Sequence, residues 1–330
     1  MRIAIIGAGI AGLSAALTLR ESGIAAVVYD KGRGPGGRTV SKRTDWGSID
    51  LGAQYFTARD RSFRSEVAQW EAADVVAPWS VNPWVLPERQ PASAQSRLVA
   101  KPRMSALARH LAKDLDLHCG VQISEMSREL GGWVLRERHG EVLGEYDAVL
   151  VTAPAPQAQS LLAEPCPALA TQVGTARMQP CWAVGLILEH ALELDFSAGF
   201  PSSGPLGWVA RSGSRPDRPH WPETWILHAT AAWSEANLEW PAEQVASYLT
   251  EAFCDLVHRR VEVTASIAHR WRFARARQSL GSEQGYLVSE DVLCAGDWVT
   301  DGRVEGAWLS GRAAAQALIR KAQGSAAPDA

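Results

Sequence analysis

The chain has 330 residues, of which 46% are hydrophobic, and a net charge of −3. This length exceeds one typical domain and allows a sizeable buried core, so we expect two globular domains. The near-neutral charge gives no support to electrostatic binding of nucleic acid or membranes. No apolar run approaches the roughly 18 residues of a membrane span, and the N-terminus lacks the apolar core of a signal peptide.

Cysteine usage narrows the class of protein further. The five cysteines form no Cys-x-x-Cys pair and show no zinc spacing. We therefore expect reduced thiols, a cytoplasmic location and no metal site. From the charge and the lack of a long apolar run we expect no nucleic-acid partner and no membrane partner.

The first thirty residues contain a strand, a glycine turn, a helix, a second strand and an acid, in that order. Residues 2–7 and 25–29 are short apolar runs, and the second run ends at Asp30. The turn follows the GxGxxG pattern, in which glycines permit the tight turn, the approach of a pyrophosphate and close helix packing. A helix N-terminus attracts phosphate, and the acid accepts hydrogen bonds from a ribose. The predicted cofactor contacts are Gly7, Gly9, Ile10, Ala11, Gly12 and Asp30.

A basic, glycine-rich segment follows the acid. Residues 31–39 read KGRGPGGRT and resemble the RxGGR segment of flavin-containing amine oxidases and their relatives. In that family the segment surrounds the FAD pyrophosphate, so the resemblance implies that Lys31, Gly37 and Arg38 bind FAD. An arginine suits this role because its guanidinium can pair with two phosphate oxygens.

Residues 45–60 continue the resemblance, because a similar segment of the family lies along the flavin. It implies flavin contacts from Gln54, Tyr55 and Phe56. Thr57, Arg59 and Asp60 follow directly, and we expect them to face the substrate. An ordinary helix start, with Asp60 as its N-cap, is an equally good interpretation of Arg59 and Asp60.

The middle of the chain predicts a second domain. Residues 62–73 predict a helix, whereas the prolines within residues 74–100 exclude a long one. Residues 117–123 predict a strand, and in relatives the valine of that strand contacts the cofactor, which here is Val121. Residues 157–284 contain three strand-like runs, a helix over 242–256 and many of the 14 tryptophans. We expect an antiparallel sheet with a helix.

A second cofactor motif lies near the C-terminus. Residues 292–297 predict a buried strand ending in a glycine and an acid, and a VEGA sequence follows at 304–307. This resembles the C-terminal FAD motif of amine-oxidase-like flavoproteins and implies contacts from Gly296, Asp297 and Val304. The helix beginning near Val304 would direct its positive end toward the flavin. Cys294 lies within the predicted strand, so we expect FAD to be bound non-covalently.

Two features depart from true amine oxidases. Those enzymes hold a lysine near the flavin from the substrate domain, yet residues 158–284 contain no lysine. They also place an aromatic residue where this chain has Arg303, which would favour an anionic ligand. With these departures the whole chain resembles bacterial renalase-like proteins. The resemblance implies oxidation of 2- and 6-dihydro isomers of NAD(P) to NAD(P)+ by hydride transfer to flavin N5, with O₂ reduced to H₂O₂.

The expected fold is α/β. A Rossmann-type, amine-oxidase-like FAD domain would comprise residues 1–56, 100–156 and 285–322, with a flexible tail at 323–330. An inserted substrate domain, an antiparallel β-sheet plus helix, would comprise residues 57–99 and 157–284.

No catalytic side chain is required, because the reaction needs orientation rather than a strong base. The substrate candidates are Thr57, Arg59, Asp60, Arg303, His269, Trp271 and Tyr286, with His228 and Trp233 as weaker candidates. Packing near the domain junction is the alternative role for the histidines, tryptophans and Tyr286. Two other functions stay open: an amine oxidase or other oxidase or desaturase of this fold, and a flavin-binding sensor without turnover.

Overall fold

The computed structural model describes residues 1–92, 94–300 and 302–324. The chain forms two compact units, each assembled from segments that are far apart in the sequence. The first unit comprises Met1–Gly37, Ala108–Met178 and Arg275–Ala330, and the second comprises Arg38–Leu107 and Gln179–Ala274. Residues 38–56 and 100–107, which were predicted to belong to the FAD domain, lie in the second unit. Residues 157–178 and 275–284, which were predicted to belong to the substrate domain, lie in the first unit.

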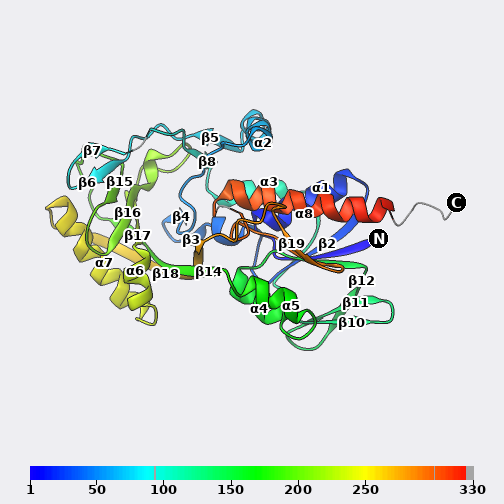
Figure 1. Ribbon diagram of the computed structural model, residues 1–330. Coiled ribbons are helices and arrows are strands. Elements are labelled where there is room, and N and C mark those ends of the chain that lie inside the picture. The colour runs from blue at the N-terminus through cyan, green and yellow to red at the C-terminus, as the bar shows by residue number, and fades with distance from the viewer. Residues whose placement is uncertain (93, 301, 325–330) are drawn as a thin grey trace. The chain divides into compact units, whose positions relative to one another are not determined.

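A six-stranded sheet forms the centre of the first unit (Figure 1). Its strands are β1 (Arg2–Ile6), β2 (Ala25–Asp30), β9 (Asp116–Cys119), β13 (Ala148–Val151), β19 (Leu287–Ser289) and β20 (Val292–Cys294). Their order is β19-β20-β13-β1-β2-β9, with parallel pairing from β20 to β9 and an antiparallel pair at β19–β20. The loops that follow β1, β2 and β20 therefore leave from the same edge of the sheet, which is where nucleotides bind in such folds.

Two helices of the first unit pack together more closely than side chains normally allow. They are α1 (Ile10–Glu21) and α8 (Val304–Gly324). A Cβ on Gly311 of α8 would lie 2.0 Å from the carbonyl oxygen of Ala11. Beside this contact, Ser14 Oγ donates a hydrogen bond to the carbonyl oxygen of Trp308 at 2.9 Å. The glycine at 311 is therefore a packing requirement.

The other face of this sheet is covered by helices and a small antiparallel sheet. The covering elements are α4 (Ala155–Leu162), α5 (Pro167–Val173), β10 (Ile123–Glu129), β11 (Gly132–Glu137) and β12 (Val142–Tyr146). Ala4, Ile6, Val149 and Val151 form one buried cluster with them. These residues alternate along β1 and β13, because successive side chains of a strand point to opposite faces.

A seven-stranded sheet forms the centre of the second unit. Its strands are β6 (Trp84–Leu86), β7 (Gln90–Pro91), β14 (Arg177–Leu188), β15 (Ala198–Pro201), β16 (Leu206–Arg211), β17 (Thr224–Ala229) and β18 (Val263–Gln278). Their order is β18-β14-β17-β16-β15-β6-β7. The pairs β14–β17, β17–β16 and β16–β15 are antiparallel, and β15–β6 is parallel. The predicted antiparallel sheet is confirmed, with residues 84–91 added at one edge.

The two faces of the seven-stranded sheet differ in their cover. On one face, Trp182, Trp225 and Leu227 pack with Val245 and Phe253 of α7 (Ala242–Val257), which follows α6 (Ala231–Ala236). On the other face, Ala183, Ile187 and Ile226 pack with Ile49 and Leu51, and Trp271 lies against them. The second face therefore meets the segment that the sequence assigns to the flavin.

Short elements complete the fold. They are 3₁₀ turns η1 (Gly37–Thr39) and η2 (Ser212–Ser214), strands β3 (Lys42–Thr44), β4 (Gly47–Ile49), β5 (Val76–Pro78) and β8 (Leu98–Ala100), and helices α2 (Arg61–Ala72) and α3 (Ser105–Leu111). The predicted helices over 62–73 and 242–256 are confirmed as α2 and α7. The strand predicted over 117–123 instead ends at Cys119, because Gly120 turns the chain with a φ of +79°.

Within the described ranges, none of the helices combines the length and apolar character needed to cross a membrane. Residues 323 and 324 of the predicted tail belong to α8, and residues 325–330 lie outside the described residues.

Candidate functional site

The glycine turn after β1 is tight on its inner side and open on its outer side. Gly7 has a φ of +114°, and a Cβ on Gly12 would lie 1.9 Å from the carbonyl oxygen of Gly7. Gly9, the N-cap of α1, has no atom within 4 Å of a built Cβ and makes no side-chain cap hydrogen bond. The first turn of α1, with Ile10 and Ala11, therefore keeps backbone N–H groups for an external acceptor.

Asp30 stabilises this turn from the end of β2. One carboxylate oxygen accepts the N–H of Ala8 at 2.6 Å, and the other accepts the N–H of Gly32 at 2.6 Å. Its backbone carbonyl accepts the N–H of Val121 at 3.0 Å, which places Val121 beside the turn. A carboxylate oxygen has a second lone pair, so Asp30 can still accept a ribose hydroxyl. The sequence predicted the ribose role but not the positioning role.

The second glycine segment folds back onto the first. Gly36 donates its N–H to the carbonyl oxygen of Ala8 at 2.8 Å. Gly37 has a φ of +52°, and a Cβ there would lie 3.4 Å from Gly9 Cα. Lys31 is exposed at the start of this segment. The first unit thus forms a backbone-lined cradle with space at Gly9, which fits the pyrophosphate of a dinucleotide.

The C-terminal motif is fixed to α8 by a buried serine. Ser310 Oγ accepts the N–H of Gly296 at 2.8 Å and donates to the carbonyl oxygen of Gly285 at 2.5 Å. Gly296 has a φ of +156°, and Asp297 beside it is 6% exposed. Val304 is the first residue of α8. This positioning role of Ser310 was not predicted from the sequence, although Ser310 lies within the C-terminal motif.

Two substrate candidates lie in the first unit. Arg303 is exposed immediately before α8, and Tyr286 is half-buried just before β19. The backbone carbonyl of Tyr286 accepts a hydrogen bond from Ser282 Oγ at 2.9 Å. Both candidates are therefore close to the C-terminal motif in the sequence.

In the second unit, the loop at residues 50–54 starts from a buried ion pair. Asp50 accepts hydrogen bonds from Arg218 Nη2 at 2.8 Å and Nε at 3.2 Å on one carboxylate oxygen. The other oxygen accepts the Ser41 hydroxyl at 2.5 Å and the Met104 N–H at 3.0 Å. Every partner of Asp50 is thus structural, and the start of the loop is fixed.

The next two residues of the loop lie against Arg38. A Cβ on Gly52 would lie 2.0 Å from the carbonyl oxygen of Arg38, which also accepts the N–H of Ala53 at 2.9 Å. Arg38 Nη1 donates to the carbonyl oxygen of Ala274 at 3.0 Å. The predicted FAD-binding arginine and the predicted flavin-contacting loop are therefore in direct contact within this unit.

The sheet face holds the loop at Leu51. Trp271 Nε1 donates to the carbonyl oxygen of Leu51 at 2.9 Å, and His228 hydrogen-bonds to the Leu51 backbone. Burial, with a smaller contribution from the nearby Arg215, lowers the pKa of His228 to about 4, so His228 is neutral at pH 7. Its Nε2 is buried and has no protein partner in the part of the chain that the structure describes. His269 packs against Trp271 at 4.3 Å, and burial lowers its pKa.

The three predicted flavin contacts have different surroundings. Gln54 Nε2 donates to the carbonyl oxygens of Asp50 at 2.5 Å and Gly52 at 3.0 Å, which closes the loop. The ring of Phe56 instead packs on Phe63 and Trp70, and its N–H and carbonyl both pair with Leu98. Phe56 is therefore part of the core around α2, a result of tertiary packing that its neighbours in sequence do not indicate.

Tyr55 belongs to a triangle of aromatic rings with Trp79 and Trp208. The ring centres are 6.2 Å apart for Tyr55–Trp79, 5.5 Å for Tyr55–Trp208 and 6.2 Å for Trp79–Trp208. Trp208 lies opposite His228 on the neighbouring strand, so the triangle adjoins the face of the sheet that holds Leu51. Two arginines lie on the rings: Arg215 Cζ is 4.7 Å from the centre of Trp79, and Arg97 Cζ is 5.2 Å from that of Tyr55. No local sequence pattern predicted that either arginine would lie on these rings.

The remaining candidates occupy other places in the second unit. Asp60 is the N-cap of α2 and accepts the N–H groups of Ser62 and Phe63 at 2.8 and 3.1 Å, so the capping interpretation is confirmed. The hydrogen bond from the Ser62 hydroxyl is the largest cause that lowers the pKa of Asp60, and the backbone N–H bonds lower it further. Arg59 is exposed, and Thr57 is buried. Trp233 stacks on Tyr248 of α7, 5.3 Å between ring centres, and so belongs to the helix-covered face.

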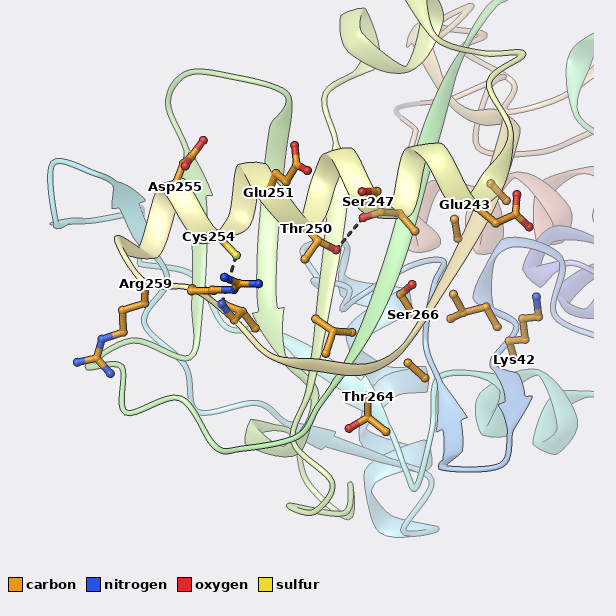
Figure 2. A pocket seen from close by; sticks show the side chains of 18 of the residues that line it. Lys42, Glu243, Ser247, Thr250, Glu251, Cys254, Asp255, Arg259, Thr264 and Ser266 are labelled. Carbon is orange, nitrogen blue, oxygen red and sulfur yellow. Dashed lines mark hydrogen bonds between the residues drawn. The ribbon is translucent and has the colours of Figure 1, made fainter.

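An open groove of about 1340 Å³ lies between α7 and β18, and Figure 2 shows side chains that line it. Charged and hydroxyl side chains line it, including Lys42, Glu243, Thr250 and Ser266. Among the described residues that line it, no buried side-chain nitrogen or oxygen lacks a hydrogen-bond partner. We therefore place no reaction in this groove. Within the described ranges, no group of three or more His, Cys, Asp or Glu side chains could hold a metal ion.

Comparison with known proteins agrees with the two cofactor motifs. Residues 5–68 match the NAD(P)-binding Rossmann-like domain, and residues 84–319 match the flavin containing amine oxidoreductase family. Hydroxyneurosporene desaturase from Rubrivivax gelatinosus is 40% identical over 58 residues, which are 18% of this chain. That match spans only 11% of the length of the desaturase.

Solved structures share the fold over nearly the whole chain. A putative protoporphyrinogen oxidase from Exiguobacterium sp. 255-15 has a TM-score of 0.77 at 13% identity, covering 97% of this chain and 99% of that chain. A triple mutant of putrescine oxidase has a TM-score of 0.74 at 11% identity, with the same coverage of 97% and 99%. At these identities the similarity shows the fold alone. The family match over residues 84–319, which is most of the chain, shows that this protein belongs to the flavin-containing amine oxidoreductase family.

Proposed function

We propose that the protein is an FAD-dependent oxidase of isomeric dihydronicotinamide dinucleotides, returning 2- and 6-dihydro-NAD(P) to NAD(P)+. One observation favours this substrate over an amine, namely the absence of lysine from residues 158–284. These residues supply most of the seven-stranded sheet. The sequence resemblance associates a lysine of that region with amine oxidation. Arg303, exposed before α8, is a second basic group that disfavours a cationic amine.

We propose FAD contacts within each of the two units. In the first unit, the cradle at Gly9 would hold the pyrophosphate, Asp30 a ribose, and Gly296, Asp297 and the start of α8 the flavin end. In the second unit, Arg38 and the loop at residues 50–54 would contact the flavin. The binding is non-covalent: Cys294, the cysteine near the motif, is fully buried in β20, and burial raises the pKa of its thiol, which disfavours the nucleophilic thiolate.

When bound, FAD supplies N5 as acceptor of the hydride from C2 or C6 of the dihydropyridine, and O₂ then takes two electrons with two protons to give H₂O₂. The protein's contribution is orientation. The aromatic triangle offers ring faces for stacking the nicotinamide. Neutral His228, with a free Nε2 lone pair, offers an acceptor for the N–H of its carboxamide. Arg59 and Arg303, both exposed, would attract the anionic dinucleotide.

A second candidate is an oxidase or desaturase of the same fold that acts on another substrate, such as a porphyrinogen, a polyene or an amine. The names of the similar proteins favour it, because they include a putative protoporphyrinogen oxidase and a hydroxyneurosporene desaturase. A flavin-binding sensor without turnover is the third candidate.

Anaerobic stopped-flow mixing tests these candidates with one readout, the loss of flavin absorbance. The purified FAD-loaded protein is mixed with borohydride-derived isomers of NADH, with ordinary NADH, with amines and with a porphyrinogen. We expect rapid bleaching by the 2- or 6-isomer and slow bleaching by the others. Bleaching by amines or by a porphyrinogen instead would establish the second candidate, and a flavin that no reductant bleaches would contradict the enzyme assignment.

A further inference from the structure

Two arginines of the second unit are buried without full hydrogen bonding. Arg215 is 2% exposed, and its Nη2 donates to Gln54 Oε1 at 2.5 Å. Its Nε and Nη1 have no partner among the described residues. Arg97 is 3% exposed, and its Nε and Nη2 likewise have none within the same described ranges. Four buried donors on two cations are therefore unsatisfied, which is costly unless a ligand accepts from them.

Among the described residues of this unit, no buried carboxylate forms an ion pair with Arg215 or Arg97. Asp50 is occupied by Arg218, Ser41 and Met104 as described above. Burial lowers the pKa of Arg215 to about 10, with Arg218 adding to the effect and Asp50 opposing it. Arg215 is still cationic at pH 7. The fold therefore carries the desolvation free energy of a buried positive charge that has no ion-pair partner among the described residues.

The second buried acid of this unit is also occupied. Glu223 accepts hydrogen bonds from Trp225 Nε1 at 2.7 Å and from the Leu192 N–H at 3.2 Å, and it lies 3.7 Å from Arg211 Nε. Neither Asp50 nor Glu223 therefore supplies the counter-charge of Arg215 and Arg97, and another group must supply it.

The surroundings of the two arginines favour an anionic ligand, rather than a rearrangement of the protein, as the source of the counter-charge. The two guanidinium groups are held over the rings of Trp79 and Tyr55, which contact each other. Guanidinium groups stacked on aromatic rings keep their N–H groups free for an oxyanion in the plane of the fork. Arg215 also lines an open surface pocket of about 470 Å³ together with Pro78, Arg218 and His220, whereas Arg97 does not line it.

We propose that Arg215 and Arg97 form a buried anion-binding subsite that receives the pyrophosphate of the dinucleotide substrate. Arg97 presents Nε and Nη2, the adjacent donors of the guanidinium fork, which match two oxygens of one phosphate. Arg215 presents Nε and Nη1, which point to different sides of the guanidinium and can donate to separate oxygens. The assignment of the occupant rests on the proposed oxidation of dinucleotides, whereas the existence of an anion subsite does not. The FAD pyrophosphate has its own cradle in the first unit, so the subsite is available to a second anion.

Calorimetric titration of the FAD-loaded protein with ADP-ribose and with inorganic pyrophosphate tests the subsite without turnover. We expect both probes to bind, and Arg215→Gln and Arg97→Gln each to weaken binding at least about tenfold, because each removes charge-assisted hydrogen bonds. Arg64→Gln, which removes an exposed charge on α2, is the matched control and should leave the affinity unchanged. Equal binding by Arg215→Gln and the unchanged protein would overturn the proposal.

Thermal melting separates anion binding from a structural role. Pyrophosphate should raise the melting temperature of the unchanged protein and not that of Arg215→Gln, at matched ionic strength. Arg215→Lys should restore part of the response. If acetate raises the melting temperature and pyrophosphate does not, the assignment to a pyrophosphate is overturned. That result would indicate a carboxylate substrate. Altered FAD content or flavin midpoint potential in Arg215→Gln, with unchanged pyrophosphate binding, would overturn the subsite in favour of a flavin contact.

The kinetics distinguish failure of this proposal from failure of the proposed function. If the dihydronicotinamide isomers bleach the flavin, Arg215→Gln should raise KM at least about tenfold with a smaller change in kcat. An unchanged KM would reject the subsite and leave the oxidase assignment intact. If no isomer bleaches the flavin but pyrophosphate binding still depends on Arg215, the anion subsite stands and the proposed substrate is rejected.

Discussion

Arg218 donates two hydrogen bonds to a single carboxylate oxygen of Asp50, and the two side chains are 2% and 1% exposed. This pair fixes the start of the loop at residues 50–54, whose later residues contact Arg38, Trp271 and Arg215. The loop that the sequence assigns to the flavin therefore depends on a buried ion pair whose two members are far apart in the chain.

Asp50→Ala should strongly destabilise the protein. The substitution leaves the Arg218 charge buried without its partner, a situation that typically costs about 3–5 kcal/mol of the free energy of unfolding. Urea denaturation measures the loss. Asp45→Ala, at an exposed position in the same region, should change it by less than about 0.5 kcal/mol. The double variant Asp50→Leu/Arg218→Met should recover much of the loss, and an Asp50→Ala protein as stable as the control would contradict the expectation.

Gly9→Ala and Gly12→Ala should separate cofactor binding from folding. A Cβ at Gly9 meets no atom within 4 Å, so the melting temperature of the apoprotein should stay nearly unchanged. FAD affinity should fall at least about tenfold, or about 1.4 kcal/mol, because the methyl group occupies the space for the pyrophosphate.

At Gly12 the new Cβ would lie 1.9 Å from a backbone oxygen, and the fold itself should lose about 1–3 kcal/mol. Apoprotein melting and FAD titration measure the two effects. A Gly9→Ala protein that binds FAD normally would show that the pyrophosphate does not approach this turn.

His228 should make stability depend on pH between about 6.5 and 4. Burial lowers its pKa from 6.5 to about 4, so in this window the unfolded chain binds a proton that the folded chain does not. The free energy of unfolding should therefore fall as the pH drops through the window, by up to about 3 kcal/mol. His228→Asn should remove this component in urea denaturation at several pH values. His139→Asn, at an exposed position, should leave the slope unchanged, and a slope that persists in His228→Asn would assign it to other groups.

Asp60→Ala should affect stability rather than substrate binding. Asp60 caps α2 through the N–H groups of Ser62 and Phe63, and loss of an N-cap costs about 1 kcal/mol. We expect this loss in thermal melting, with an unchanged KM for the substrate that bleaches the flavin. Asp60→Ser should retain most of the stability, because serine is also a good cap. A raised KM at unchanged stability would instead place Asp60 at the substrate.

The parts of the protein that could be predicted from sequence are those encoded by local spacing. The GxGxxG turn requires glycine at 7 and 12 for reasons of backbone geometry, and the structure shows both requirements. The amphipathic period of α7 and the apolar runs of β14 and β17 likewise depend on neighbours in the chain.

The pairings between distant residues could not be predicted in this way. Arg97 and Arg215 have no local signal of burial, because an arginine in a polar stretch normally lies on the surface. Their position on the aromatic rings depends on the packing of segments far apart in sequence. Trp271 was predicted as a substrate candidate from its type, whereas its hydrogen bond to Leu51 follows from the register of β18 against the loop.

The close contact of α1 with α8 has a consequence for biosynthesis. The cradle begins with residues 7–12, which are synthesised before α8, yet Ala11 and Ser14 of its helix pack on Gly311 and Trp308. The nascent chain must therefore keep this side of α1 uncovered until α8 has been made. A stable nucleotide site forms only after α8 is released, so cofactor loading follows synthesis of that helix.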